Sequence, residues 1–158
     1  MADVHDLKTR RKNMSAIRNR DTRPERIVSE ILQASRFHVG PADRGLTGNP
    51  DFILPEQKIV IFVNGCFWHG HRSTCFKLPA NNQGFWRKKI NRNKERDRHV
   101  WQHYQSQKEW RCLVIWECAL TGPARLNRNY LQCLLFEWIE TGGQFLEMEP
   151  FLPDEWSD

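Results

Sequence analysis

The sequence predicts an α/β sandwich in which helices flank a central mixed β-sheet. Short apolar runs bounded by turn residues indicate buried strands, and longer segments with apolar residues every three or four positions indicate amphipathic helices. These signals follow one another in the order helix, hairpin, helix, strand, helix, without a repeat or a low-complexity linker. A chain of 158 residues suits one hydrophobic core, so we expect a single domain over residues 1–158.

The first expected element is a basic helix or arm within residues 1–20, covering about Asp6–Arg18. Thr22 and Glu25 then have the spacing of a capping box, with Pro24 in the first turn, where its missing N–H costs nothing. The helix that follows should end near Arg36. Its buried face should carry four aliphatic residues: Ile27, Val28, Ile31 and Leu32.

Two apolar runs, residues 51–54 and 59–63, predict a β-hairpin whose second strand is buried on both faces. A long helix is expected at about residues 83–105, then a buried strand at 111–116 and a last helix at about 124–139. The apolar stripe of that last helix should consist of Tyr130, Leu131, Leu134, Leu135 and Trp138. Residues 141–158 are interpreted as an acidic, loosely held tail.

The net charge of +5 favours polyanions only mildly, but its distribution is more informative. Eight lysines and arginines lie within residues 8–26, and seven lie within residues 87–98. Two separated basic stretches suit a protein that grips a phosphate backbone from two sides. Two solvated helix faces would give the same pattern, so that alternative stays open.

The chain has no apolar stretch of about 20 residues and no apolar signal-peptide core, so we expect a cytoplasmic protein. Its five cysteines are an odd number. In a reducing compartment they argue against a disulfide framework and for thiols that serve as metal ligands or fill the core.

A carboxylate opens the first predicted strand in Asn49-Pro50-Asp51. Fixed by the preceding proline, it is well placed to hold a hard divalent cation against a phosphate oxygen. A lone Pro-Asp pair is more often a simple turn. The metal interpretation gains weight because the neighbouring strand, ending at Val63-Asn64, should bring its last backbone carbonyl beside Asp51.

A loop rich in Gly, Cys and His follows, and a further cysteine comes after the strand that ends at residue 116. Together they supply four nitrogen and sulfur donors: Cys66, His71, Cys75 and Cys118. This set suits a closed tetrahedral zinc site, with buried free thiols as the alternative. Cys112 and Cys133 are expected to fill the core. His69 remains outside the tetrahedron and can exchange a proton near neutral pH beside Asp51.

Aromatic pairs occur on this loop, at Phe67-Trp68, and at the start of the basic helix, at Phe85-Trp86. We expect Phe85 in the core. Because the predicted metal tethers the loop, Phe67-Trp68 is a candidate wedge between stacked bases, with core burial as the alternative. On the long helix, Asp97 either accepts a hydrogen bond, from the histidine or from metal-bound water, or is a surface charge. The spacing alone favours the surface charge.

Five ordered motifs share their residues and separations with a known family: Pro50-Asp51, Gly65–His69, Phe85-Trp86, Glu95–Asp97 and Ile115–Cys118. Together with the opening Met-Ala-Asp-Val-His-Asp and Lys12-Asn-Met14, they make the chain resemble the very short patch repair endonucleases over about residues 1–140. The resemblance implies a restriction-endonuclease-like core of the PD-(D/E)xK type. It also implies an enzyme that nicks one DNA strand 5′ to the T of a T·G mismatch.

The resemblance assigns roles to residues. Asp51 and the carbonyl of Val63 would hold catalytic Mg2+, and the four cysteine and histidine donors would hold structural Zn2+. His69 would serve as acid or base, with Asp97 assisting through water and Glu25 nearby. DNA contacts would come from Phe67, Trp68 and Trp86 in the base stack, Met14 in the minor groove, and Lys89 and Asn93 beside the mismatch.

The resemblance further implies duplex DNA with a T·G mismatch as substrate, a mismatch-repair ATPase as partner, and a monomer on the bacterial nucleoid. Two features depart from the family pattern. Val63-Asn64 stands where the family has Thr-His; a carbonyl ligand survives that change, but Asn64 cannot shuttle a proton. Three residues separate His71 from Cys75 where the family has one.

Two other functions fit the same residues. One is a restriction-like endonuclease of the same fold that cuts intact duplex sites. The other is a zinc-stapled DNA-binding module without catalysis, which the basic stretches favour and which Asp51 and His69 make less plausible.

Overall fold

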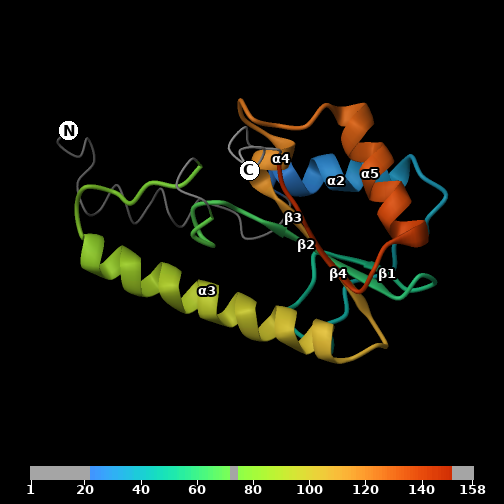
Figure 1. Ribbon diagram of the computed structural model, residues 1–158, viewed down its shortest axis with the longest axis horizontal. Coiled ribbons are helices and arrows are strands. Elements are labelled where there is room, and N and C mark those ends of the chain that lie inside the picture. The colour runs from blue at the N-terminus through green and yellow to red at the C-terminus, as the bar shows by residue number, and fades with distance from the viewer. Residues whose placement is uncertain (1–21, 72–74, 151–158) are drawn as a thin grey trace, which may run out of the picture.

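A four-stranded mixed sheet lies between helices on both of its faces in the computed structural model, which describes residues 22–71 and 75–150 (Figure 1). The strands stand side by side in their sequence order: β1 (Phe52–Leu54), β2 (Ile59–Asn64), β3 (Arg111–Trp116) and β4 (Phe145–Met148). β1 pairs antiparallel with β2, whereas β2 with β3 and β3 with β4 are parallel. The predicted hairpin and mixed sheet are therefore confirmed.

The helices of the described residues form the outer layers. They are α2 (Arg23–Gln33), α3 (Gln83–Ser106), α4 (Glu117–Leu120) and α5 (Arg128–Thr141). α3 runs along one face of the sheet, and α2 and α5 cover the opposite face (Figure 1). The N-terminal part of α3 extends well past the sheet (Figure 1).

The core is divided between these two faces because neighbouring residues of a strand point to opposite sides. On the β2 and β3 strands, Ile61 and Leu113 face α2 and α5, whereas Val60 and Val114 face α3. Both central strands are buried on both faces, as their continuous apolar runs predict.

α2 begins as the sequence predicts, since the Thr22 hydroxyl accepts a hydrogen bond from the Glu25 N–H at 3.5 Å and Pro24 lies in the first turn. Its buried face carries Val28, Ile31 and Leu32, with Ile27 partly buried against the same core. The helix ends at Gln33 rather than near Arg36, as Ala34 takes the C-cap position and Ser35 bends the chain back onto the Leu32 carbonyl.

α5 starts at Arg128, later than predicted, because the Asn127 side chain caps it by accepting the N–H groups of Asn129 and Tyr130. The predicted stripe is only partly right: Tyr130 is 43% exposed, and Ile139 takes a buried place instead. Cys133 is exposed, so its assignment to the core is wrong. Cys112 is fully buried, as predicted, and burial raises the pKa of its thiol to about 12.

The sequence predicted no strand in residues 141–150, and β4 corrects that expectation. Apolar and polar residues alternate too weakly over its four positions to predict a strand. Tertiary contacts determine its pairing with β3. Gln144 provides the anchor just before the strand. Its side-chain amide donates hydrogen bonds to the backbone carbonyls of Tyr104, Gln107 and Trp110. Its backbone carbonyl accepts a hydrogen bond from the Cys112 N–H.

Arg111 joins the sheet to α5. Its guanidinium donates hydrogen bonds to the carbonyls of Trp138, Ile139, Gly142 and Gly143 and lies 4.6 Å from the Trp138 ring centroid. A cation at this position satisfies the free carbonyls at a helix C-terminus and complements the helix dipole. The contact therefore stabilises α5 against the sheet.

We expect Arg111→Met to lower the free energy of unfolding by about 2 kcal/mol, because partly buried carbonyls at the end of α5 lose a charged donor. In a chain of this size that loss corresponds to a melting temperature lower by roughly 4–8 °C. The matched control is Arg36→Met, which removes an ion pair between the exposed side chains of Arg36 and Glu140. Exposed pairs contribute at most about 1 kcal/mol, so equal thermal shifts in the two variants would contradict the prediction.

The predicted N-terminal arm lies outside the described residues, as does most of the first basic stretch. Within residues 22–71 and 75–150, no helix combines the length and the apolar character needed to cross a bilayer.

Candidate active site and metal centre

A pocket opens where β2 ends and α3 passes the sheet. Five of its lining residues are the ones to which the sequence assigned catalytic or cation-binding roles: Glu25, Asp51, Val63, His69 and Asp97. They come from five different places in the fold: the first turn of α2, the residue before β1, the end of β2, the following loop and α3. The fold therefore brings together acidic, imidazole and backbone groups that are up to 72 positions apart in sequence.

Asp51 is fixed to the β2 strand in two ways. Its N–H donates to the Ile61 carbonyl at 2.9 Å, and its Oδ2 accepts the Val63 N–H at 2.7 Å. Pro50 before it is buried, so the chain enters β1 in a defined direction. As a result, a half-buried carboxylate stands beside the last residues of β2, as the sequence predicts.

His69 faces Asp97 across the pocket. Its Nδ1 lies 2.6 Å from Asp97 Oδ2, and the two side chains are 27% and 16% exposed. When Nδ1 carries the proton, its N–H donates a hydrogen bond to the carboxylate and Nε2 is left as an acceptor. Asp97 thus bonds the histidine, and the interpretation as a plain surface charge is wrong.

Gly70 lies between His69 and His71, whose side chains point to different sites. It has a φ of +57°, and a Cβ placed there would lie 2.5 Å from Ile90 Cγ2 on α3. The left-handed backbone and the close approach to α3 both require glycine. This turn directs His69 to the pocket and His71 to a second site.

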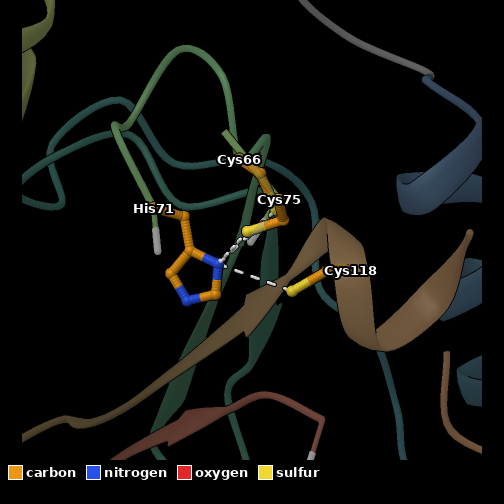
Figure 2. A group of neighbouring side chains, drawn as sticks. All are labelled: Cys66, His71, Cys75 and Cys118. Carbon is orange, nitrogen blue, oxygen red and sulfur yellow. Dashed lines mark hydrogen bonds between the residues drawn. The ribbon is translucent and has the colours of Figure 1, made fainter. Parts of the chain in front are cut away.

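That second site is the Cys3His cluster, which consists of Cys66, His71, Cys75 and Cys118. Figure 2 shows the ring of His71 pointing its Nδ1 toward the sulfur atoms. The distances from Nδ1 to the sulfurs of Cys66, Cys75 and Cys118 are 3.6, 3.1 and 3.4 Å. All four ligand atoms lie within 4.8 Å of one another, so these side chains can hold one metal ion.

Two thiols of the Cys3His cluster, those of Cys66 and Cys75, have raised pKa values. A hydrogen bond with Cys118 and burial raise the pKa of Cys66 to about 12, and burial and a hydrogen bond with Cys66 raise that of Cys75 to about 11. A metal ion bound here would therefore displace thiol protons.

An aromatic cluster lies beside the pocket, and its members are Phe67, Trp68, Phe76, Phe85 and Trp86. Phe67, Trp68 and Trp86 contact one another, with centroid separations of 5.1–6.0 Å. The Lys89 ammonium lies 5.1 Å from the Trp68 centroid and 5.8 Å from that of Trp86. A partly buried lysine of the second basic stretch thus lies over these rings.

Phe85 is 57% exposed, so its predicted place in the core is wrong. It lies in the first turn of α3, in the part of the helix that extends past the sheet (Figure 1). Asn93, predicted to contact DNA, donates its amide N–H to the Trp68 carbonyl at 2.8 Å. That bond ties the loop of Trp68 to α3.

Comparison with known proteins identifies the family. The family model described as "DNA mismatch endonuclease Vsr" matches residues 2–75. The chain is 45% identical over 139 residues to the DNA mismatch endonuclease Vsr of Escherichia coli (strain K12), and the match covers 88% of each chain. The chain belongs to the Vsr family.

Two other relatives are nicking enzymes. Type II nicking enzyme V.XorIIP of Xanthomonas oryzae pv. oryzae is 34% identical over 83% of this chain and 98% of its own length. Type II nicking enzyme V.NmeAIP of Neisseria meningitidis serogroup A is 35% identical over 81% of this chain and 94% of its own length. The family resemblance stated from the motifs is confirmed.

The two departures from the Vsr-family pattern have clear structural outcomes. Cys75 reaches the Cys3His cluster in spite of the wider spacing from His71. Asn64 lines the pocket and is only 5% exposed, and its Nδ2 has no hydrogen-bond partner among the residues that the structure describes. Position 64 therefore gives this Vsr-family pocket a buried amide and no titratable group.

Sequence reasoning missed two residues at these sites. Phe76 packs on Phe67 at a centroid distance of 5.8 Å, and Glu149 bonds His71. For Phe76, the one signal in the sequence was its position directly after Cys75. Glu149 follows the unpredicted strand β4, so no local pattern links it to the cluster. Met14 lies outside the described residues.

Proposed function

We propose that this chain is a Mg2+-dependent endonuclease that nicks one strand of duplex DNA 5′ to the T of a T·G mismatch. The observation that carries the proposal is the pocket that unites Asp51, His69 and Asp97 next to a partly exposed aromatic cluster. Membership of the Vsr family supports the same activity. We assign the activity to one restriction-endonuclease-like domain of the PD-(D/E)xK type.

The pocket has the ligands that a hard cation prefers. Asp51 offers a carboxylate and Val63 a backbone carbonyl, and oxygen donors of this kind suit Mg2+. Bound there, Mg2+ would neutralise the phosphate charge and orient a water molecule. Asp51 holds its place through the Val63 N–H, so its carboxylate needs little reorganisation to bind. Glu25 adds a further carboxylate to the pocket wall.

His69 is our candidate for proton transfer. Asp97 accepts from Nδ1, which orients the ring and leaves Nε2 to exchange a proton with the attacking water or with the leaving 3′ oxygen. Asn64 cannot share this task, because an amide does not titrate near neutral pH. Proton transfer in this pocket therefore depends on His69 alone among the two residues.

We expect His69→Ala to lower the nicking rate by roughly 10²–10⁴-fold, the range typical for loss of a general acid or base. Single-turnover rates on a T·G duplex measure this. His103→Ala is the matched control, because His103 is an exposed histidine in the last turn of α3. An unchanged rate in His69→Ala would remove His69 from the chemistry.

The Cys3His cluster fits Zn2+. Tetrahedral zinc with bonds of about 2.0–2.1 Å to nitrogen and about 2.3 Å to sulfur separates these ligand atoms by roughly 3.5 Å. The distances from His71 Nδ1 to the three sulfurs, 3.1–3.6 Å, match that value. With all four positions taken by protein, the role we propose is structural: the ion holds the loop that carries His69 and Trp68.

We assign mismatch recognition to the aromatic cluster. Phe67, Trp68 and Trp86 would enter the base stack. Unstacking the bases for this insertion costs less free energy at a T·G mismatch than at a T·A pair. Lys89 contacts these rings and would bring a positive charge to the same bases, and Asn93 would act both there and through its bond to the Trp68 carbonyl. We assign a contact from the minor groove to Met14, by family resemblance alone.

We also propose a monomer that works on bacterial nucleoid DNA in the cytoplasm with a mismatch-repair ATPase as partner, since repair enzymes of this kind act where the mismatch arises. These assignments rest on the family resemblance.

The decisive experiment compares two duplexes that differ in one base. We expect a single nick 5′ to T in the T·G duplex with Mg2+, and an intact T·A parent. Cutting of both duplexes would instead indicate a restriction-like endonuclease. Binding without any Mg2+-dependent nick would indicate a DNA-binding module.

A further inference from the structure

The imidazole of His71 is held from several sides. Its Nδ1 faces the three sulfurs of the Cys3His cluster, and its Nε2 lies 2.8 Å from Glu149 Oε2. The ring also stacks on Trp116, with 3.9 Å between centroids and 11° between planes. The His71 side chain is only 7% exposed, so it has little freedom to turn.

The β4 region contacts His71 through Glu149 and also supports Trp116, on which the ring stacks. Glu149 directly follows β4 and bonds His71, and Glu147 within β4 accepts the Trp116 indole N–H at 3.0 Å. β4 thus orients the ring directly through one glutamate and indirectly through the other. The Glu149 side chain is 24% exposed, which makes its bond to His71 partly shielded from water.

We infer that Glu149 is a positioning residue of the metal centre, which fixes the His71 ring with Nδ1 toward the metal ion. An imidazole has two nitrogens, and a carboxylate that accepts the N–H of one of them commits the other to the metal. Such a partner also makes the ligating nitrogen more basic. The inference rests on the zinc assignment proposed above.

The contact has a structural consequence. The Cys3His cluster joins the loop that carries Trp68 and His69 to Cys118 in α4, the short helix that directly follows β3. Glu149 adds a link from the same loop to the end of β4. The metal centre therefore connects the loop to the segments that directly follow β3 and β4.

The test compares Glu149→Ala and Glu149→Gln with two controls in the full-length, zinc-loaded protein. Glu56→Gln removes one negative charge in the β1–β2 turn, at the end of β2 remote from the cluster. Leu146→Ala shortens an exposed side chain of β4 and keeps both glutamates that act on the His71 and Trp116 rings. Zinc content is measured by atomic absorption, zinc affinity by competition with a chromogenic chelator, and folding by circular dichroism.

We expect one zinc per wild-type chain and an affinity about 10–100-fold weaker in Glu149→Ala, the usual effect of losing such a partner. Glu149→Gln keeps an acceptor oxygen and should fall between wild type and Glu149→Ala, and both controls should bind as wild type does. The Co2+-substituted Glu149→Ala protein should show a shifted absorption spectrum, which a merely structural role of Glu149 would leave unchanged.

Different failures have different meanings. Wild-type protein that contains and binds no zinc would overturn the zinc assignment together with this inference, while the nicking assay would still test the activity. Tight zinc binding and an unchanged Co2+ spectrum in both Glu149 variants would overturn the inference alone. Equal weakening in Leu146→Ala would also overturn it, because disturbance of β4 would then suffice.

Discussion

Asp51→Asn protein is expected to bind mismatched DNA and to leave it uncut. The amide loses the negative charge that attracts a divalent cation, and removal of such a cation costs several kcal/mol of transition-state stabilisation. We therefore expect the nicking rate to fall by at least about 10³-fold. An asparagine oxygen can still accept the Val63 N–H, so the fold of the β1–β2 region should survive. Single-turnover nicking and gel-shift binding on the same T·G duplex measure the two properties.

The matched control is Asp43→Asn. Asp43 lies in the loop that precedes β1, is exposed, and accepts the Gly45 N–H through its side chain at 2.8 Å. The same chemical change there should leave the rate unaltered. A rate in Asp51→Asn equal to that of wild type would refute the assignment of the cation to Asp51.

The second large effect is expected for Trp68→Ala, which should erase the preference for T·G over T·A. Loss of one stacking ring typically weakens binding by about 1–3 kcal/mol per base, or roughly 5–150-fold. Trp68 contacts Phe67, Trp86 and Lys89, so its removal also leaves the rest of the wedge without support. Affinities for matched and mismatched duplexes, measured at one salt concentration, give the preference.

Trp110→Ala is the control for loss of a tryptophan as such. Trp110 is partly buried just before β3, at the end of the sheet opposite the metal centre, with Lys58 Nζ 4.9 Å from its ring centroid. That variant should be less stable but should discriminate as wild type does. If Trp68→Ala kept full discrimination, Trp68 would be a packing residue.

The strands and long helices were predictable because their signals are local. Buried apolar runs identified β2 and β3, and helical periodicity identified α3. β4 was not predictable, because its short sequence becomes a strand only through pairing with β3 and through the anchor at Gln144. The exposure of Phe85 follows from how far α3 extends past the sheet, which periodicity does not determine.

The candidate site also has residues that local sequence signals predict and residues that only tertiary contacts bring into place. The residue types and spacings alone predict Asp51, His69 and the Cys3His cluster as site residues. Whether Asp97 meets His69 depends on the direction of α3 relative to the loop, and the spacing pointed to the wrong alternative. Glu149 depends on β4, so it was missed together with that strand.

The central claim is that a cation held by Asp51 lies beside the imidazole of His69. Mn2+, a hard cation that also takes oxygen ligands, can replace Mg2+ in a nuclear magnetic resonance titration, because its unpaired electrons broaden the signals of nearby nuclei. We expect Mn2+ to broaden the His69 imidazole signals in the wild-type protein and to leave them sharp in Asp51→Asn at the same concentration. Sharp His69 signals in wild-type protein that binds Mn2+ and nicks T·G DNA with it would contradict the account.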